Sequence, residues 1–245
     1  MIWADLGRGR VFSGERDAIY RPKYYRPEKK PAVLYIHGAE ATGGAVDWMG
    51  IPTRWPLFRA LVRAGYTVLS ADLGGSRTWG NDTVISRITS LYDLSQTLPD
   101  ILPGRVLMVG QSMGNLNQTV WAAANKNKVI SLVGIIPVID VNDIHTIDAG
   151  SSAVIDEAYG GTYVEATQGI NHNPMTMATA GKLSDIRMQM WYGDTDTLCR
   201  PQRAVAFGQQ SGAEMHAISG GHAESTVSNV DLAAVLEFMK ASIVA

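Results

Sequence analysis

The run at residues 106–118 constrains the fold of this chain more than any other segment. In it, a strand-like stretch is followed by a serine that lies between two glycines. The residues read VLMVGQSMGNLNQ, with Ser112 between Gly110 and Gly114. A strand that turns abruptly into a helix holds the corner residue in a strained conformation with positive φ. The residues two positions to either side must then be nearly free of side chains, so that the backbones can pass. The run therefore predicts a strand, a tight turn at Ser112 and a helix.

Strand-like and helix-like segments alternate along most of the chain. This alternation is typical of an α/β fold, in which helices cover both faces of a mostly parallel sheet. Strands are expected over residues 31–38, 67–75, 105–110, 129–139, 186–194 and 213–219. Helices are expected over residues 55–66, 86–101, 112–126, 201–212 and 229–240.

Residues 140–185 interrupt this alternation. They are rich in Gly, Ser, Thr and Asn and contain no clean strand. We expect a short insertion over the carboxyl edge of the sheet, with one or two short helices. Because no repeat, low-complexity tract or linker is present, the sequence predicts a single domain over residues 1–245.

Composition narrows the classes of partner. With 245 residues, of which 46% are hydrophobic, the chain can fill a sizeable core. Its net charge is −2, and its 21 basic residues form no basic run, so it lacks the electrostatic footprint of a nucleic-acid or anionic-lipid binder. A small-molecule or exposed ester substrate is favoured instead. The single cysteine, Cys199, leaves no internal disulfide to form.

The expected location is cytoplasmic, without a membrane span. Charges at Asp5, Arg8 and Arg10 fall where a secretory signal needs an apolar core of about 7–15 residues. The longest apolar run, 129–139, is shorter than the roughly 20 residues that span a bilayer. A protein carried on a virus particle or exported by another route would share these features.

The serine at the turn has the setting of a nucleophile. Its side chain is expected beyond the carboxyl ends of the strands, where open α/β sheets bind ligands. The N–H of Met113, at the start of the following helix, can donate to a developing oxyanion. A serine hydroxyl also needs an adjacent base that is oriented by a carboxylate.

Residues that could serve as base and acid follow downstream. His222 lies in the glycine-flanked loop SGGHAES, after a predicted strand, whereas His216 is expected to be an ordinary strand residue. The segment WYGDTDTLCRP, at 191–201, leaves another strand end and offers two carboxylates, Asp194 and Asp196. The residues by themselves leave the choice of acid open.

In the chain order serine, acid, histidine, these motifs resemble the α/β-hydrolase superfamily. The acid loop of that superfamily resembles G-x-x-D followed by an apolar residue and a proline, which Gly193, Asp196, Leu198 and Pro201 match. The resemblance therefore implies that Asp196 is the acid and that Asp194 caps the loop by bonding nearby N–H groups. It covers residues 31–240 and implies no cofactor.

The resemblance also implies a second oxyanion donor. The stretch YIHGAEATGG, at 35–44, is similar to the loop that supplies it, which points to the N–H of Ala39, or of Glu40 if the loop is shifted. His37 would then tie this loop down rather than move protons. The chain departs from the common pattern at Gln111, where many relatives have histidine, and at Asn115, where many have glycine.

Hydrolysis of a carboxylic ester through an acyl-enzyme on Ser112 is the function that this resemblance implies. A thioesterase or an amidase is the alternative enzyme, and a serine at this position argues against the dehalogenase and epoxide-hydrolase branches, which need a carboxylate nucleophile. A rival from another class is a binding or structural module in a larger assembly, with its Ser-His-Asp residues idle.

Two further groups of residues invite an interpretation. Apolar residues expected near the site form a candidate pocket for a short or exposed acyl group; they are Trp48, Trp79, Met113, Met175 and Met177. The stretch DVNDIHTID, at 140–148, crowds oxygen and nitrogen ligands, but it lacks the glycine and terminal glutamate of a calcium loop. A polar turn is the favoured interpretation there, and no metal is expected.

Overall fold

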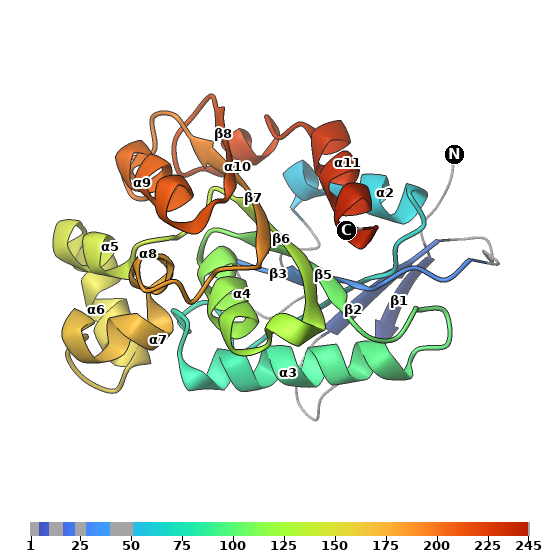
Figure 1. Ribbon diagram of the computed structural model, residues 1–245, viewed down its shortest axis with the longest axis horizontal. Helices are drawn as coiled ribbons and strands as arrows, with labels where there is room; N and C mark the ends of the chain where they lie inside the picture. The colour runs from blue at the N-terminus through green and yellow to red at the C-terminus, as the bar shows by residue number, and fades with distance from the viewer. Residues whose placement is uncertain (1–4, 10–16, 23–27, 40–50, 245) are drawn as a thin grey trace.

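An eight-stranded sheet forms the centre of the protein (Figure 1). The computed structural model describes residues 5–9, 17–22, 28–39 and 51–244. The pairs β1–β2 and β2–β4 are antiparallel, and the five other pairs are parallel. In spatial order the strands are β1 (Asp5–Gly9), β2 (Asp17–Arg21), β4 (Val68–Ala71), β3 (Val33–Ile36), β5 (Val106–Gln111), β6 (Val129–Ile135), β7 (Arg187–Gly193) and β8 (Glu214–Ile218).

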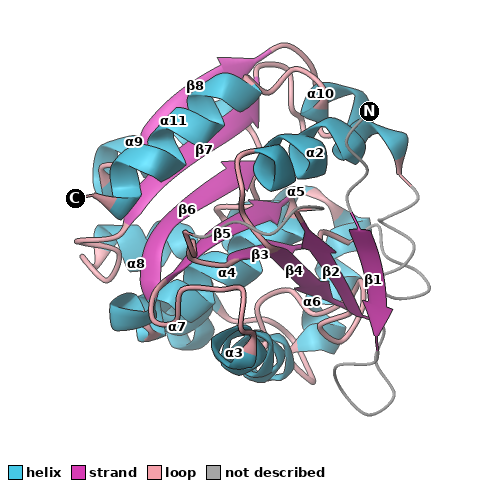
Figure 2. Cartoon of the chain, turned by 90° about the vertical axis from the view of Figure 1, so that its right-hand side faces the viewer, coloured by secondary structure: helices cyan, strands magenta, loops and turns pink. Residues whose placement is uncertain are grey.

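Helices cover both faces of this sheet, as the sequence predicts (Figure 2). One face packs against α2 (Trp55–Arg63), which follows the 3-10 turn η1 (Pro52–Arg54), and against α11 (Leu232–Ile243). The other packs against α3 (Asp82–Thr97), α4 (Met113–Ala124) and α9 (Pro201–Ser211). The 3-10 turn η2 (Lys126–Lys128) lies between α4 and β6, and the short helix α10 (Glu224–Val227) lies between β8 and α11.

The central strands are apolar at successive positions because both of their faces are covered by helices. In β5, Val106 and Met108 belong to the core beneath α3 and α4, whereas Leu107 and Val109 belong to the core beneath α2 and α11. Successive side chains of a strand point to opposite faces, so a strand that is covered on both sides must be apolar at every position. Strand β5 is accordingly buried along its whole length.

The segment between β6 and β7 is more helical than the sequence predicts. It contains no strand, as expected, but more than the one or two short helices predicted: α5 (Val141–Ile147), α6 (Ala149–Ala158), the π-helical turn η3 (Glu165–Gly169), α7 (Ile170–His172) and α8 (Pro174–Thr179). Side-chain caps account for much of the difference. Asp140, Asp148 and Asn173 each accept a hydrogen bond from a backbone N–H in the first turn of the following helix.

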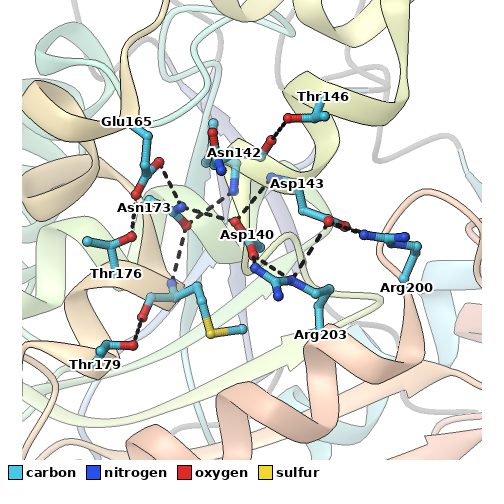
Figure 3. A network of polar contacts seen from close by, with 12 residues as sticks. Asp140, Asn142, Asp143, Thr146, Glu165, Asn173, Thr176, Thr179, Arg200 and Arg203 are labelled. Atoms are coloured by element: carbon cyan, nitrogen blue, oxygen red, sulfur yellow. Dashed lines mark hydrogen bonds and ion pairs between the residues drawn. The ribbon is translucent and has the colours of Figure 1, made fainter.

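The polar residues of 140–148 form a helix cap and ion pairs rather than the predicted turn. In Figure 3, Asp140 accepts a hydrogen bond of 2.7 Å from Nε of Arg203, and Asp143 accepts one of 2.9 Å from Nε of Arg200. Asn173 donates to Asp140 from the far end of the segment. These contacts fasten the helices after β6 to the start of α9, and so to the loop that precedes it.

Strand β6 is shorter than the sequence predicts. The apolar run continues to residue 139, but the strand ends at Ile135, and Ile136 adopts a positive φ of 42°. Pro137 follows and has no N–H to donate to a neighbouring strand. The chain therefore leaves the sheet level with the turn at Ser112, whose carbonyl accepts from the N–H of Val138.

Within the part of the chain that the structure describes, no helix is both long and apolar enough to cross a membrane.

Candidate active site

The turn between β5 and α4 has the geometry that the sequence predicts. Ser112 lies between the last residue of the strand and the first of the helix, with φ 52° and ψ −122°. A Cβ atom on Gly110 would lie 2.6 Å from the carbonyl oxygen of Gly114, and one on Gly114 would lie 2.0 Å from that of Ile36. Both distances are shorter than any ordinary contact, so the turn requires glycine at both positions.

Ser112, His222 and Asp196 form one hydrogen-bonded chain. Ser112 Oγ lies 2.7 Å from Nε2 of His222, and Nδ1 of His222 lies 2.8 Å from Oδ2 of Asp196. An ionised carboxylate only accepts hydrogen bonds, so the proton of a neutral imidazole belongs on Nδ1. Nε2 is then free to accept the serine proton. Asp196 is buried, whereas Ser112 and His222 are partly exposed.

The loop after β7 orients the Asp196 carboxylate from its other side. Its Oδ1 accepts hydrogen bonds of 2.9 Å and 2.8 Å from the backbone N–H groups of Leu198 and Cys199. Asp194 bonds a backbone N–H, as the sequence predicts, but that group belongs to Gly220, 26 residues later, and not to its own loop; the distance from Oδ1 to the nitrogen is 2.9 Å. Asp194 thereby joins the acid loop to the loop that carries His222.

Cys199 lies close enough to Asp196 and His222 for the three to be considered as metal ligands. They are the one such group of His, Cys, Asp and Glu residues within the described part of the chain. Burial, followed by the nearby carboxylates of Asp196 and Asp143, raises the pKa of the Cys199 thiol well above its ordinary value. A metal needs the thiolate, and the other two side chains already bond each other. The donor set therefore favours a hydrogen-bonded arrangement over a metal centre.

Met113 and Ala39, the predicted oxyanion donors, line one cavity with Ser112. Met113 is the first residue of α4, where helix N–H groups have no acceptor within the helix. Ala39 is exposed at the end of the described segment after β3, and Glu40, its alternative, lies outside the described residues. His37 ties this segment down as predicted, with Nε2 lying 2.7 Å from the carbonyl oxygen of Asp72.

The cavity at Ser112 has a volume of about 270 Å³ and a partly apolar wall. Trp79 lines it together with Ile136 and Leu198. Met175 and Met177, which the sequence also places in the pocket, do not line it: they are buried in the core beneath α4, because α8 packs against α4 and α9. Trp48 lies outside the described residues.

Trp79 is held in place by its backbone. Its φ is 39°, in the left-handed region that side-chain-bearing residues rarely adopt. The hydroxyl of Tyr159, from α6, donates to the Trp79 carbonyl at 2.8 Å, and the Trp79 N–H lies 3.4 Å from Sδ of Met113. The helices after β6 therefore support one wall of the cavity.

Glu224 is a cavity residue that sequence reasoning missed. It lies two positions after His222 and accepts a hydrogen bond of 2.8 Å from Nε2 of Gln111, the residue before Ser112. It also forms an ion pair with Arg54, which is fully buried. The place of Glu224 beside the predicted histidine was a usable signal in the sequence, but nothing in the sequence marks Arg54 as buried.

Comparison with known proteins finds similarity in structure but not in sequence. No protein-family model and no curated protein matches the chain. Solved structures do match it. A fluorophosphonate-binding serine hydrolase, FphF of Staphylococcus aureus, aligns with a TM-score of 0.74 at 13% identity, covering 98% of each chain.

Two further solved structures align over almost the whole chain. An S-formylglutathione hydrolase from Agrobacterium tumefaciens has a TM-score of 0.70 at 14% identity, covering 96% of this chain and 93% of that one. A truncated carbohydrate esterase from gut microbiota has a TM-score of 0.74 at 15% identity, covering 94% and 91%. At these identities the likeness concerns the fold.

Proposed function

Since the chain has the α/β-hydrolase fold, we propose that it is a serine hydrolase that cleaves carboxylic esters through an acyl-enzyme on Ser112. One observation carries the proposal: Ser112 Oγ, the His222 ring and the Asp196 carboxylate form a continuous hydrogen-bonded chain that opens into a cavity. A nucleophile, a base and a group that orients the base are the parts that acyl transfer needs.

In the proposed mechanism, Ser112 Oγ attacks the ester carbonyl carbon while its proton passes to Nε2 of His222. Asp196 stabilises the imidazolium, and the N–H groups of Met113 and Ala39 bond the oxyanion of the tetrahedral intermediate. His222 then gives the proton to the leaving alcohol as the carbon–oxygen bond breaks. Water then takes the place of the alcohol: His222 removes its proton as it attacks the acyl-enzyme, and returns a proton to Ser112 Oγ as the acid leaves.

The names of the structural neighbours support hydrolysis of an ester or a thioester. They include a serine hydrolase and a carbohydrate esterase, and also an S-formylglutathione hydrolase, whose named substrate is a thioester. A thioesterase or an amidase would use the same steps, and differs in the leaving group alone. Parallel assays with an ester, a thioester and an amide of the same acyl group separate these reactions.

Covalent labelling tests the proposal directly. We expect a fluorophosphonate to add one phosphonyl group to the protein, because the probe reacts with a serine whose proton is withdrawn by a neighbouring base. Intact-mass spectrometry would give the stoichiometry, and peptide mapping would place the label on Ser112. Labelled protein should not hydrolyse p-nitrophenyl acetate. If the protein takes up no label and turns over no ester, the binding-module alternative is favoured.

The size of the cavity predicts the length of the acyl group. At about 270 Å³ it is smaller than the roughly 300–1,000 Å³ of typical ligand pockets. We therefore expect kcat/KM to be higher for p-nitrophenyl acetate and butyrate than for octanoate and palmitate. The p-nitrophenyl series, assayed in one buffer, gives this profile.

Replacing Trp79 is expected to change that profile. The substitution Trp79→Gly removes the ring from the cavity wall, and glycine tolerates the φ of 39° at this position. The ratio of octanoate to acetate kcat/KM should rise about 10-fold, the scale of a changed contact with a methylene group. Met177→Ala is the matched control, since Met177 is equally buried but does not line this cavity. An unchanged ratio in Trp79→Gly would contradict the assignment of Trp79 to the acyl pocket.

A further inference from the structure

The Glu224 carboxylate joins three distant parts of the chain beside the site. Its Oε1 accepts from Nε2 of Gln111 at 2.8 Å and also from the Arg54 guanidinium. Its Oε2 accepts from the hydroxyl of Thr53 at 2.7 Å. Glu224 is the first residue of α10 and lies two positions after His222. One side chain therefore connects the histidine loop to η1 and to the end of β5.

Arg54 keeps this carboxylate charged. The guanidinium is buried at the end of η1, where an unpaired charge would be costly. Burial by itself raises the pKa of Glu224. The bonds from Arg54, Thr53 and Gln111 lower the pKa by more than burial raises it, so that it lies below its ordinary value. Glu224 is consequently ionised at neutral pH and is a strong acceptor for Gln111.

Gln111 carries the connection to the nucleophile. Its Oε1 accepts a hydrogen bond of 3.0 Å from the hydroxyl of Tyr35, in β3, while its Nε2 donates to Glu224. The side chain is buried and both ends of its amide are bonded, so its orientation is set. Gln111 immediately precedes Ser112. A shift of Glu224 would therefore disturb the residue that leads into the strained turn.

The histidine loop depends on such contacts because it has little regular structure. Residues 219–223 form no helix or strand, and they include Gly220 and Gly221. Asp194 and Asp196 attach this loop from the side of β7. Glu224, directly after the loop, attaches it to β5 and η1.

We propose that Glu224 is a positioning residue, which holds the His222 loop against the strand end that carries Ser112 and so maintains the contact between Ser112 Oγ and Nε2 of His222. The proposal rests on the hydrolase function proposed above. Small displacements of reacting groups cost about 100-fold in rate. Loss of the Glu224 contacts should therefore slow the step in which Ser112 attacks and should leave substrate binding nearly unchanged.

A double substitution tests the proposal without leaving a buried charge. Glu224→Gln alone would remove the carboxylate that faces the buried Arg54 guanidinium, whereas Arg54→Met with Glu224→Met replaces the ion pair by unbranched apolar side chains. We expect kcat for p-nitrophenyl acetate and the rate of fluorophosphonate labelling to fall together by about 10- to 100-fold. KM should stay within about 2-fold, because positioning acts on the attack rather than on binding.

A second variant keeps the test informative if the double variant does not fold. Gln111→Met cuts the connection to β5 and leaves the Arg54–Glu224 pair in place. It should lower kcat and the labelling rate by the same factor and leave KM unchanged. The matched control is Arg77→Met with Glu157→Met, which removes an ion pair whose two side chains are both exposed. This control should keep the wild-type rates.

The outcomes separate this proposal from the function on which it rests. If the wild-type protein neither labels nor hydrolyses esters, the proposed function fails before any variant is compared. If the wild type is active and a folded variant, checked by circular dichroism and melting temperature, keeps kcat and labelling within 2-fold, Glu224 is not a positioning residue. A rise in KM with kcat unchanged would likewise overturn the proposal and would assign Glu224 to substrate binding.

Discussion

Replacing Ser112 with alanine is expected to lower kcat for p-nitrophenyl acetate by about 10⁴-fold or more. The methyl group of alanine cannot attack a carbonyl, and within the described residues Ser112 Oγ is the hydrogen-bond partner of His222 Nε2, at 2.7 Å. The fold should be retained, because the substitution removes one oxygen atom from a partly exposed residue. Initial rates measured with protein purified separately from the wild type, to avoid carry-over, give the ratio.

A second serine of the cavity provides the comparison for this experiment. Ser151 lines the cavity, and its backbone N–H donates to Asp148 at the start of α6. Ser151→Ala should still take up one equivalent of fluorophosphonate, whereas Ser112→Ala should take up none. Full ester hydrolysis by Ser112→Ala would refute the acyl-enzyme mechanism and would direct the search to another group.

The features that the sequence predicts correctly depend on short-range sterics and on burial. The turn at Ser112 follows from two glycines within five residues, and the structure places backbone atoms where their side chains would be. The predicted strands at 186–194 and 213–219 correspond to β7, which is buried at five of its seven positions, and to the edge strand β8, of which Ile218 is the buried residue.

The features that sequence reasoning misses depend on partners that are far apart in the chain. Strand β2 pairs with β4 and β1 pairs with β2, both in an antiparallel arrangement, and neither β1 nor β2 has a strong strand pattern of its own. Context decides such strands more than intrinsic propensity does. Arg54 and Glu224 are 170 residues apart, and each is expected on the surface when read alone. Their pairing becomes visible only when the fold brings η1 and α10 together.

The substitution Asp196→Asn is expected to lower kcat by about 10⁴-fold while the fold is kept. The amide oxygen of asparagine can still accept the N–H groups of Leu198 and Cys199, so the loop should retain its shape. The amide nitrogen would then face Nδ1 of His222 as a donor. That contact favours the tautomer with the proton on Nε2, which can no longer accept the proton of Ser112.

Asp194→Asn is the matched control for this prediction, because it makes the same chemical change two residues earlier. The Asp194 carboxylate accepts from the N–H of Gly220, and an asparagine oxygen can accept there as well, so the loss in kcat should be less than about 10-fold. Melting temperatures of the two variants should be similar to each other. If Asp194→Asn lost activity as severely as Asp196→Asn, orientation of the whole loop rather than the tautomer of His222 would explain both losses. Retention of kcat by Asp196→Asn would remove Asp196 from the mechanism altogether.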